Sequence, residues 1–452
     1  MSRPLAAHAA LGFTLSEQLT VIVLCALTAF VSHLALAVFN DGVRPFMLDF
    51  VQGRTRRGEA TAVSFGLSAG FVFGLGAPMA LSTGVLNPWL LFLPTDVLGL
   101  LAPRKWLAPL LGGAWGALVV FGLEGANDVA HRLPVDFLTA LQQMSTPILY
   151  LFTLFPVLAI SKQFGRRWGG AAAVLELALV LLTTKVWPNV FAGALAMAAG
   201  VLVLIALAVA RDLGAGRTRS GDGSAHRTGG SATSDEADAD PMASLFGASA
   251  LRLRRRLPLF MVLGAGVCVL AQLHVFGGGE ATSFLIAKGH YAEAAQVDFY
   301  RAFGFLPLIA TTALASGAYG IVGFTFVYPI GYLLPHPVLA ALAGAAVFAA
   351  EILALSSIGR LLGRLPTVRD SSQQLRGAIT DTLHLAILFG SLLAANAMGG
   401  GLGILIVGGL YLCNETMGRP VVRMAAAPAA VVAGGILLNL LHWVHLFTPV
   451  KG

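Results

Sequence analysis

The chain has 452 residues, of which 57% are hydrophobic and 11% are charged, and its formal net charge is +7. A typical soluble chain is about 25% charged, and the mean hydropathy here is +0.80, so the composition excludes an ordinary soluble domain and indicates a membrane protein. The positive charge does not indicate a nucleic-acid surface, because no basic stretch is interleaved with aromatic residues.

The first long apolar run covers residues 17–39 and is preceded by a single basic residue, Arg3, without a small-residue cleavage site. We therefore expect a retained first helix and not a signal peptide. The three cysteines, Cys25, Cys268 and Cys413, lie in apolar runs, where a thiol behaves as a small hydrophobe. No disulfide framework, metal site or cofactor is expected.

Many segments are long enough to cross a bilayer core of about 30 Å, which takes roughly 20 apolar residues. The candidates are 17–39, 60–82, 85–101, 105–123, 145–162, 169–186, 190–210, 257–276, 302–334, 338–358, 377–398, 400–414 and 424–447. The predicted fold class is all-α, a polytopic transmembrane helical bundle of about 12–14 passes including broken or re-entrant helices. The predicted domains are an N-terminal bundle (1–210), a flexible cytoplasmic linker (211–256) and a C-terminal bundle (257–452).

The segment 302–334 has no formal charge, and as one straight helix it would be roughly 50 Å long. This length exceeds the bilayer core, so two short passes or a broken, re-entrant pair are expected. The residues that interrupt it are Gly304, Pro307, Gly317, Gly320, Gly323 and Pro329.

Residues 211–256 are rich in glycine and serine, then acidic, and end in a basic cluster before the next apolar run. Such a composition is typical of a flexible linker. The positive-inside bias places it in the cytoplasm with the other basic loops, and both chain ends outside. The basic cluster is interpreted as a topology anchor, with binding of anionic lipid or a partner as the alternative.

Two similar segments, "FNDGVRPF" (39–46) and "CNETMGRPV" (413–421), each follow an apolar run at the predicted cytoplasmic boundary. One interpretation is a pair of interfacial helix breaks, since Arg and Pro are both tolerated there. The other is that paired carboxylates and guanidinium groups form a gate. The gate hypothesis names Asn40, Asp41, Arg44, Asn414, Glu415 and Arg419.

A solute site is predicted where polar residues interrupt apolar passes. In "LNPWLLFLPTDVLG" Asp96 lies within a span, where an ionisable residue is expensive and by default a functional candidate; the alternative is that it caps a helix break. Hydroxyls and glycines in "TTALASGAYG" are typical of a discontinuous transport helix, although simple helix packing also explains them. The predicted substrate-binding residues are Asn87, Thr95, Asp96, Thr311, Thr312, Ser316 and Glu351.

The pattern Gly66-Leu-Ser-Ala-Gly70 matches the nucleophile elbow of serine hydrolases. It lies inside an apolar helical span, and Gly66, Gly70 and Gly74 recur every fourth residue, as in closely packed membrane helices. Catalysis by Ser68 is therefore not expected. No metal-binding or nucleotide-binding motif is present.

Several segments together resemble one family. They are "NDGVRP", "FGLSAGF", "TGVLNPWLLFLPTDVLG", "RAFGFLPLIATTALASGAYGIVGFTFVY", "AEILALSSIGRLLGR", "NETMGRPV" and "GILLNLLHW". In number and order they resemble the YhfT-like family of bacterial inner-membrane proteins, from about residue 19 to the C-terminus. The resemblance implies a multi-pass protein of the inner (cytoplasmic) membrane, in an uncharacterised family commonly described as transporters.

The predicted function is a secondary transporter or permease that moves a small polar or anionic solute through a site built from broken helices, and not an enzyme. The alternative is a polytopic membrane enzyme or a membrane subunit that works with soluble partners. The expected partners are the lipid bilayer, a small-molecule solute, and a proton or sodium ion; no nucleic acid is expected, and a homo-oligomer is compatible with the sequence.

The predicted topology can be tested at the linker. A cysteine introduced at Ser231 should resist an impermeant thiol reagent added to intact cells, once access across an outer membrane is allowed for, because the linker is expected to be cytoplasmic. Ready labelling from outside would reverse the whole topology.

Overall fold

The computed structural model describes residues 12–40, 56–187, 192–221 and 241–449, and within them it is an all-α polytopic helical bundle with two very short strands. The elements of the first half are α1 (Leu15–His33), β1 (Ala37–Val38), α3 (Arg57–Phe71), η1 (Val72–Gly76), α4 (Ala77–Thr83), α5 (Pro88–Leu91), α6 (Leu93–Leu101), α7 (Leu107–His131), α8 (Phe137–Leu141), η2 (Gln142–Met144), α9 (Ser145–Phe152), α10 (Phe155–Phe164), α11 (Arg166–Val186) and α12 (Ala192–Gly221). Those of the second half are α13 (Pro241–Arg254), α14 (Leu257–Gln272), α15 (Glu280–Ala287), α16 (Tyr291–Ser316), β2 (Tyr319–Gly320), η3 (Ile321–Phe326), α17 (Val327–Leu333), α18 (Pro337–Arg364), α19 (Pro366–Thr416) and α20 (Arg423–Trp443).

In the described part of the chain, seven helices are long and apolar enough to cross a membrane, and a bent pair, α8–α9 with α10, makes an eighth span if it is counted as one. Four shorter apolar helices accompany them, at Val72–Thr83, Pro88–Leu101, Leu257–Gln272 and Ile321–Leu333. The long α19 is itself two helices, because Gly399 and Gly400 have non-helical backbone angles. The protein is therefore a multi-pass membrane protein in which several passes are short or interrupted.

The interruptions lie where the sequence predicts them. In the segment 302–334, α16 ends at Ser316, Gly317 takes a φ of +63°, and the chain continues through β2 and η3 into α17. The prediction of a discontinuous segment is confirmed. Likewise α4 ends before Gly84, which has a φ of +70°, and Asn87 caps the short α5. Glycine is favoured at both positions because positive φ strains other residues.

The region predicted to be a linker is partly helical. Helix α12 extends to Gly221, and α13 occupies residues 241–254, whereas residues 222–240 lie outside the described part. The reason is that Ala250 and Leu253 are spaced to share one face, which is buried against α16 and α18. Arg252 of α13 also donates to the backbone carbonyls of Leu34 (3.3 Å) and Ala35 (3.1 Å), where α1 ends.

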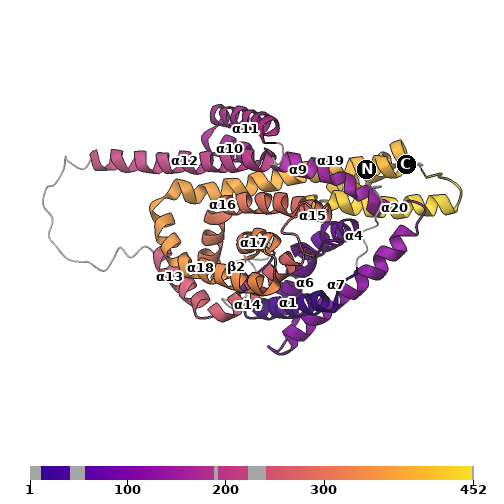
Figure 1. Cartoon of the computed structure of the whole chain (residues 1–452), viewed down its shortest axis with the longest axis horizontal. Helices are drawn as coiled ribbons and strands as arrows, with labels where there is room; N and C mark the ends of the chain where they lie inside the picture. The colour runs from indigo at the N-terminus through magenta and orange to yellow at the C-terminus, as the bar shows by residue number, and fades with distance from the viewer. Residues whose placement is uncertain (1–11, 41–55, 188–191, 222–240, 450–452) are drawn as a thin grey trace.

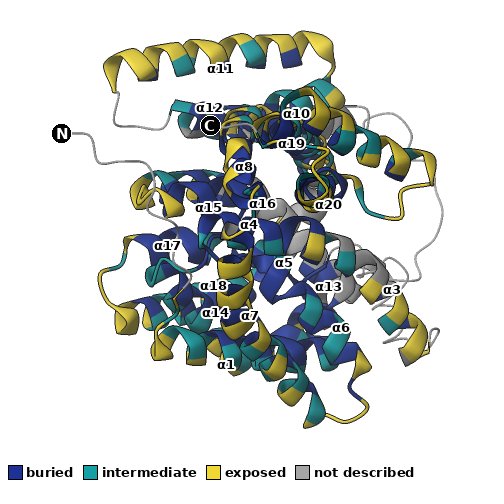
Figure 2. Cartoon of the chain, turned by 90° about the vertical axis from the view of Figure 1, so that its right-hand side faces the viewer, coloured by how far each residue is buried: buried dark blue, intermediate teal, exposed yellow. Residues whose placement is uncertain are grey.

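The helices form layers (Figure 1). Helices α12, α19 and α20 lie along one side, with α12 and α20 both packed on α19, and α1 and α14 lie against each other on the opposite side. Helices α4, α6 and α15 to α17 lie between them. In Figure 2, α11 is an outlying helix with mostly exposed residues, packed on α10 and α12. The interrupted helices therefore occupy the interior.

Four helix breaks meet in two pairs in that interior. We name them in chain order: the first break (34–40) follows α1, the second (84–87) follows α4, the third (273–279) follows α14 and the fourth (317–320) follows α16. The first pairs with the fourth through the parallel strands β1 and β2. The second pairs with the third through a parallel bridge between Leu86 and Phe276.

The two pairs have the same geometry. Tyr319 N donates to Leu36 O at 2.8 Å, and Leu86 N donates to Val275 O at 2.8 Å. Leu36 and Val275 each directly follow a residue of positive φ, Ala35 (50°) and His274 (58°). The donors Tyr319 and Leu86 each stand two residues after their left-handed glycine. The two halves of the chain thus repeat the same local structure.

The helices around the breaks repeat as well. Helix α1 packs on α6 and α7, and α14 packs on α17 and α18 in the same way, while α1 and α14 contact each other. A two-fold axis produces reciprocal contacts: if an element of one half contacts a given element of the other half, their two equivalents also contact each other. The described residues within 15–131 and 257–364, that is, without 41–55, therefore form an internal repeat related by an approximate two-fold axis.

The repeat depends on close helix crossings at equivalent glycines. A Cβ on Gly112 of α7 would overlap the carbonyl oxygen of Cys25, and a Cβ on Gly344 of α18 would overlap Gly264 O and lie 2.5 Å from Cys268 Cβ. Gly112→Ala and Gly344→Ala should each lower the free energy of unfolding by about 1–3 kcal/mol, because the helices must separate. The measurement is unfolding of the purified protein in detergent.

The matched control is Gly125→Ala, also in α7, because no atom lies within 4 Å of a Cβ there. This change should be neutral or stabilising by up to about 1 kcal/mol, since alanine favours a helix. Equal effects at Gly112, Gly344 and Gly125 would contradict the close crossings.

Candidate functional site

A fully buried ionic cluster lies at the third break. Asp298 and Arg301, one turn apart in α16, form a salt bridge of 2.6 Å, and their exposed fractions are 0% and 8%. Tyr332 of α17 donates its hydroxyl to Asp298 Oδ2 at 2.9 Å and accepts from Gly278 N at 2.8 Å. Arg301 also donates to Gly278 O at 3.1 Å. The unwound backbone is thus held from two helices.

The glycines of the third break make this approach possible. A Cβ on Gly278 would overlap the ring of Tyr328 and lie 2.6 Å from Asp298 Oδ2, and a Cβ on Gly279 would lie 2.5 Å from Arg301 Nη1. Gly279 is also the N-cap of α15, whose first residue is Glu280. The run Gly277-Gly-Gly-Glu280 therefore lets α15 start directly against the charged residues of α16.

A cavity of about 150 Å³ opens beside this cluster. Its polar lining comes from Glu280, Arg301, Thr325 and Tyr328, and backbone of Gly278. The remaining lining residues are Pro88, Trp89, Ile321, Val322, Ile379 and Leu383. Elements from both repeats and from α19 therefore meet around one small space.

Two acceptor atoms of the lining are not satisfied within the described part of the protein. Among the described residues, Glu280 Oε1 and the Tyr328 hydroxyl are buried and have no hydrogen-bond partner. Glu280 is 2% exposed. Since buried polar groups are nearly always hydrogen-bonded, these two atoms are the ones available to a bound molecule or proton.

The first half of the repeat has its own buried carboxylate at a helix break. Asp96 of α6 is fully buried; its Oδ2 accepts from the backbone N of Phe39 (2.7 Å) and Asn40 (2.8 Å), and its Oδ1 accepts from Ser32 at 2.6 Å. Asn40 in turn donates to Ser68 at 3.1 Å. Asp96 thus holds the first break as Tyr332 holds the third.

Ser68 and Arg301 occupy equivalent places, the same number of residues before Gly84 and Gly317. Ser68 lies within α3, is 2% exposed, and accepts from an asparagine side chain. A nucleophile elbow needs an exposed serine on a strand-to-helix turn, so its surroundings are those of a packing residue.

The other residues predicted from the first half serve the second break. Asn87 donates to Gly76 O at 2.8 Å and accepts from Leu90 N at 3.0 Å as the N-cap of α5. Thr95 donates to Phe92 O within its own helix at 2.7 Å. Both are fully buried. Neither is among the residues that line the cavity of about 150 Å³.

Of the predicted site residues in the second half, only Glu351 has a described side chain. Thr311, Thr312 and Ser316 belong to α16, but their side chains lie outside the described part of the structure. Glu351 of α18 accepts a hydrogen bond from the hydroxyl of Tyr319 in the fourth break. Its role in solute binding stays a prediction, as do those of Asn87, Thr95 and Asp96.

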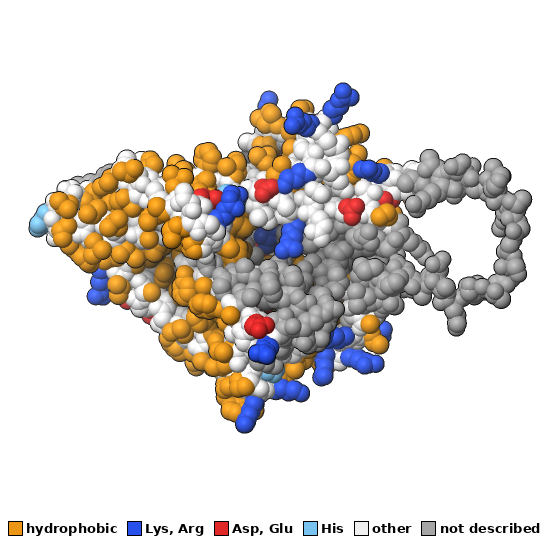
Figure 3. Space-filling model, turned by 180° about the vertical axis from the view of Figure 1, so that it is seen from behind, with side chains coloured by type: hydrophobic (Ala, Val, Ile, Leu, Met, Phe, Trp, Pro, Cys, Tyr) orange, Lys and Arg blue, Asp and Glu red, His pale blue; other side chains and the backbone are white. Residues whose placement is uncertain are grey.

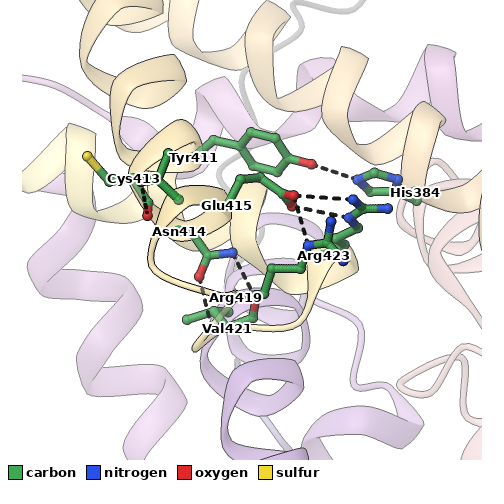
Figure 4. Close-up of polar contacts among 9 residues, drawn as sticks. His384, Tyr411, Cys413, Asn414, Glu415, Arg419, Val421 and Arg423 are labelled. Atoms are coloured by element: carbon green, nitrogen blue, oxygen red, sulfur yellow. Dashed lines mark hydrogen bonds and ion pairs between the residues drawn. The ribbon is translucent and has the colours of Figure 1, made fainter.

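The second boundary motif is a compact turn between α19 and α20 (Figure 4). Asn414 closes the turn by donating to Val421 O and accepting from Val421 N, both at 2.9 Å. Glu415 forms salt bridges with Arg419 at 2.8 Å and Arg423 at 3.2 Å. These groups are partly exposed, so they tie two helices together at the surface.

The pair His384 and Tyr411 extends this cluster, with 2.8 Å between Nε2 and the hydroxyl (Figure 4). Asp381, three residues before His384 in α19, forms a salt bridge with Lys162 at 2.5 Å. The gate hypothesis also needs Asp41 and Arg44, which lie outside the described residues. It therefore stays a prediction.

The cluster of Glu280, Asp298, Arg301, Tyr328 and Tyr332 is absent from the residues predicted from the sequence. Two signals could have found it. The run "GGGE" directly follows an apolar span, and Asp298 and Arg301 are three residues apart just before the long uncharged segment. Charged residues with helical spacing at the start of an apolar pass indicate an internal pair.

The salt bridge can be tested by single and double substitution. Arg301→Met should lower the free energy of unfolding by about 3–5 kcal/mol, because it leaves Asp298 as a buried charge without its cation. Combining it with Asp298→Asn should recover part of that loss, since both charges are then gone. Unfolding in detergent gives the coupling energy, and purely additive effects would argue against a direct pair.

Comparison with known proteins finds similarity along nearly the whole chain. The sequence profile of the YhfT family, described as a protein of unknown function, matches residues 17–447. "Uncharacterized protein YhfT" of Escherichia coli (strain K12) is 39% identical over 446 residues, covering 96% of this chain and 99% of that protein. No solved structure is similar. With the resemblance of its motifs confirmed over this length, the chain belongs to the YhfT family.

Proposed function

We propose that this protein is a secondary transporter of the bacterial inner membrane that moves a small polar solute through the cavity beside the third break. Membrane transporters commonly bind their solute where discontinuous helices from two internal repeats meet. Here all four breaks meet between the repeats 15–131 and 257–364. Irregular backbone inside a membrane is tolerated only where it is buried in protein or lines a cavity.

The observation that carries the proposal is the cavity itself. It is lined by a carboxylate, a guanidinium and a phenol in the interior of a membrane bundle, where ionisable groups are costly and mark pathways for ions or solutes. Its volume of about 150 Å³ lies below the range of about 300–1,000 Å³ for drug-sized ligands. The solute is therefore small.

The repeat supplies a way to alternate access. In the predicted topology α1 runs inward and α14 runs outward, so the two-fold axis lies in the membrane plane and the repeats are inverted. Lys and Arg side chains gather toward the side where α12 ends, whereas the opposite side is mostly hydrophobic (Figure 3), in keeping with the positive-inside bias. Exchanging the conformations of the two repeats would then open the cavity to the other face.

Tyr328 gives a direct test. Purified protein is screened with a panel of small polar solutes by thermal shift, and those that stabilise it are tested for uptake into proteoliposomes. Tyr328→Phe should weaken solute binding about tenfold, because it removes one hydrogen bond worth about 1.4 kcal/mol. The control is Tyr150→Phe, whose side chain lies on an exposed position of α9.

Two results would count against the proposal. Uptake of no stabilising solute by the wild-type protein would contradict transport. Equal affinities of the wild type and Tyr328→Phe would contradict this cavity as the binding site.

A further inference from the structure

Glu280 is placed differently from the other buried acids of the cluster. It is the first residue of α15, is 2% exposed, and lines the cavity. Asp298 beside it has an arginine and a tyrosine hydroxyl as partners, whereas Glu280 Oε1 has no hydrogen-bond partner among the described residues. A buried carboxylate with an unsatisfied oxygen is costly in its charged form.

The ionisable groups around Glu280 leave one negative charge uncompensated. Helix α16 provides Asp298 and Arg301, which neutralise each other at 2.6 Å. Helix α17 provides Tyr328 and Tyr332, and neither phenol can supply a positive charge. The pair and the carboxylate together carry a net charge of −1 when Glu280 is ionised.

Among the described residues, the other elements around the cavity supply no cation to its lining. His274 of the third break is engaged with Tyr332 O at 3.1 Å and stacks on Tyr291. Helix α4 has no ionisable residue, and Tyr150 of α9 is 60% exposed. Helices α5, η3 and α19 contribute apolar residues and Thr325 to the lining. A proton on Glu280 is therefore the simplest way to make this group of buried side chains neutral.

We propose that Glu280 is a proton-binding site and that its proton couples solute movement to the proton gradient. This step rests on the proposed transport function. While the cavity is closed around a solute, Glu280 is protonated and neutral. When the cavity opens to water on the side of release, the solute leaves and the carboxyl gives its proton to a water molecule there. The empty site returns without that proton, and the carboxylate takes up a proton from water when the cavity opens on the other side.

A proton fits the site better than a metal cation. The unsatisfied acceptors are Glu280 Oε1 and the Tyr328 hydroxyl, and the Arg301 guanidinium lines the same cavity. A positive charge at short range opposes a metal ion strongly in a medium of low dielectric constant. A proton needs a single acceptor atom, and it removes the charge that the membrane interior penalises.

Proton binding can be measured without a solute. Infrared difference spectra of the purified protein, recorded as the pH is raised from neutral, should lose a carbonyl band of a protonated carboxylic acid. Glu280→Gln should lack this band, and Glu280→Asp should retain it at a shifted position. The control Glu293→Gln should keep the wild-type band, because Glu293 is paired with His290 at 3.0 Å and is partly exposed.

Each outcome decides the assignment. If the Glu280→Gln variant unfolds like the wild type and still shows an unchanged band, the proposal is overturned. So would the absence of any such band in the wild type. Retention of the band in Glu280→Asp and Glu293→Gln, with its loss only in Glu280→Gln, supports it.

Coupling is tested in proteoliposomes with the solute found by thermal shift. Wild-type and Glu293→Gln uptake should rise when the outside is acidified, and the ratio of uptake with and without the gradient should fall to about one in Glu280→Gln. Stimulation by a sodium gradient and not by a pH gradient would overturn the coupling role. Failure of wild-type uptake under every gradient would contradict the proposed transport function, while the infrared result would still decide proton binding.

Discussion

The interior of this protein depends on one constraint: backbone groups released from a helix inside a membrane must find partners within the protein. The two parallel bridges, Tyr319 N to Leu36 O and Leu86 N to Val275 O, satisfy this requirement reciprocally, because each break of one repeat is the partner of a break in the other. Neither repeat can keep its helices interrupted alone. The broken helices, the two-fold relation and the central position of the cavity all follow from this mutual dependence.

Each half adds its own means of holding the chain beyond its bridge. In the first half, Asp96 accepts from two backbone amides and a serine. In the second half, the Tyr332 hydroxyl accepts a hydrogen bond from Gly278 N. The same hydroxyl donates to Asp298, which is paired with Arg301. Gly278 and Gly279 have no side chain, so the backbone there lies directly against Asp298 and Arg301.

The sequence predicts the architecture better than the site. Span lengths and the positions of Gly84 and Gly317 locate the breaks, because both signals are local. The partners of each break are distant in sequence, and no local pattern indicates that Asp96 faces Phe39 N. Residues 277–301 carry too many polar residues to form an apolar span, so α15 and the start of α16 are read as a loop. The cluster of Glu280, Asp298 and Arg301 is missed for this reason.

Because the partners of a buried residue are distant in sequence, an ionisable residue in a span does not by itself identify the functional site. Asp96 and Glu280 are both buried acids, and the sequence favours Asp96 because it stands alone in an apolar pass. Hydrogen bonding decides otherwise: Asp96 uses both oxygens on the protein, whereas Glu280 keeps one oxygen without a partner at a cavity. A satisfied carboxylate stabilises a fixed structure. An unsatisfied one changes its energy with each change of protonation or access, and it is therefore the group suited to respond when the two repeats move.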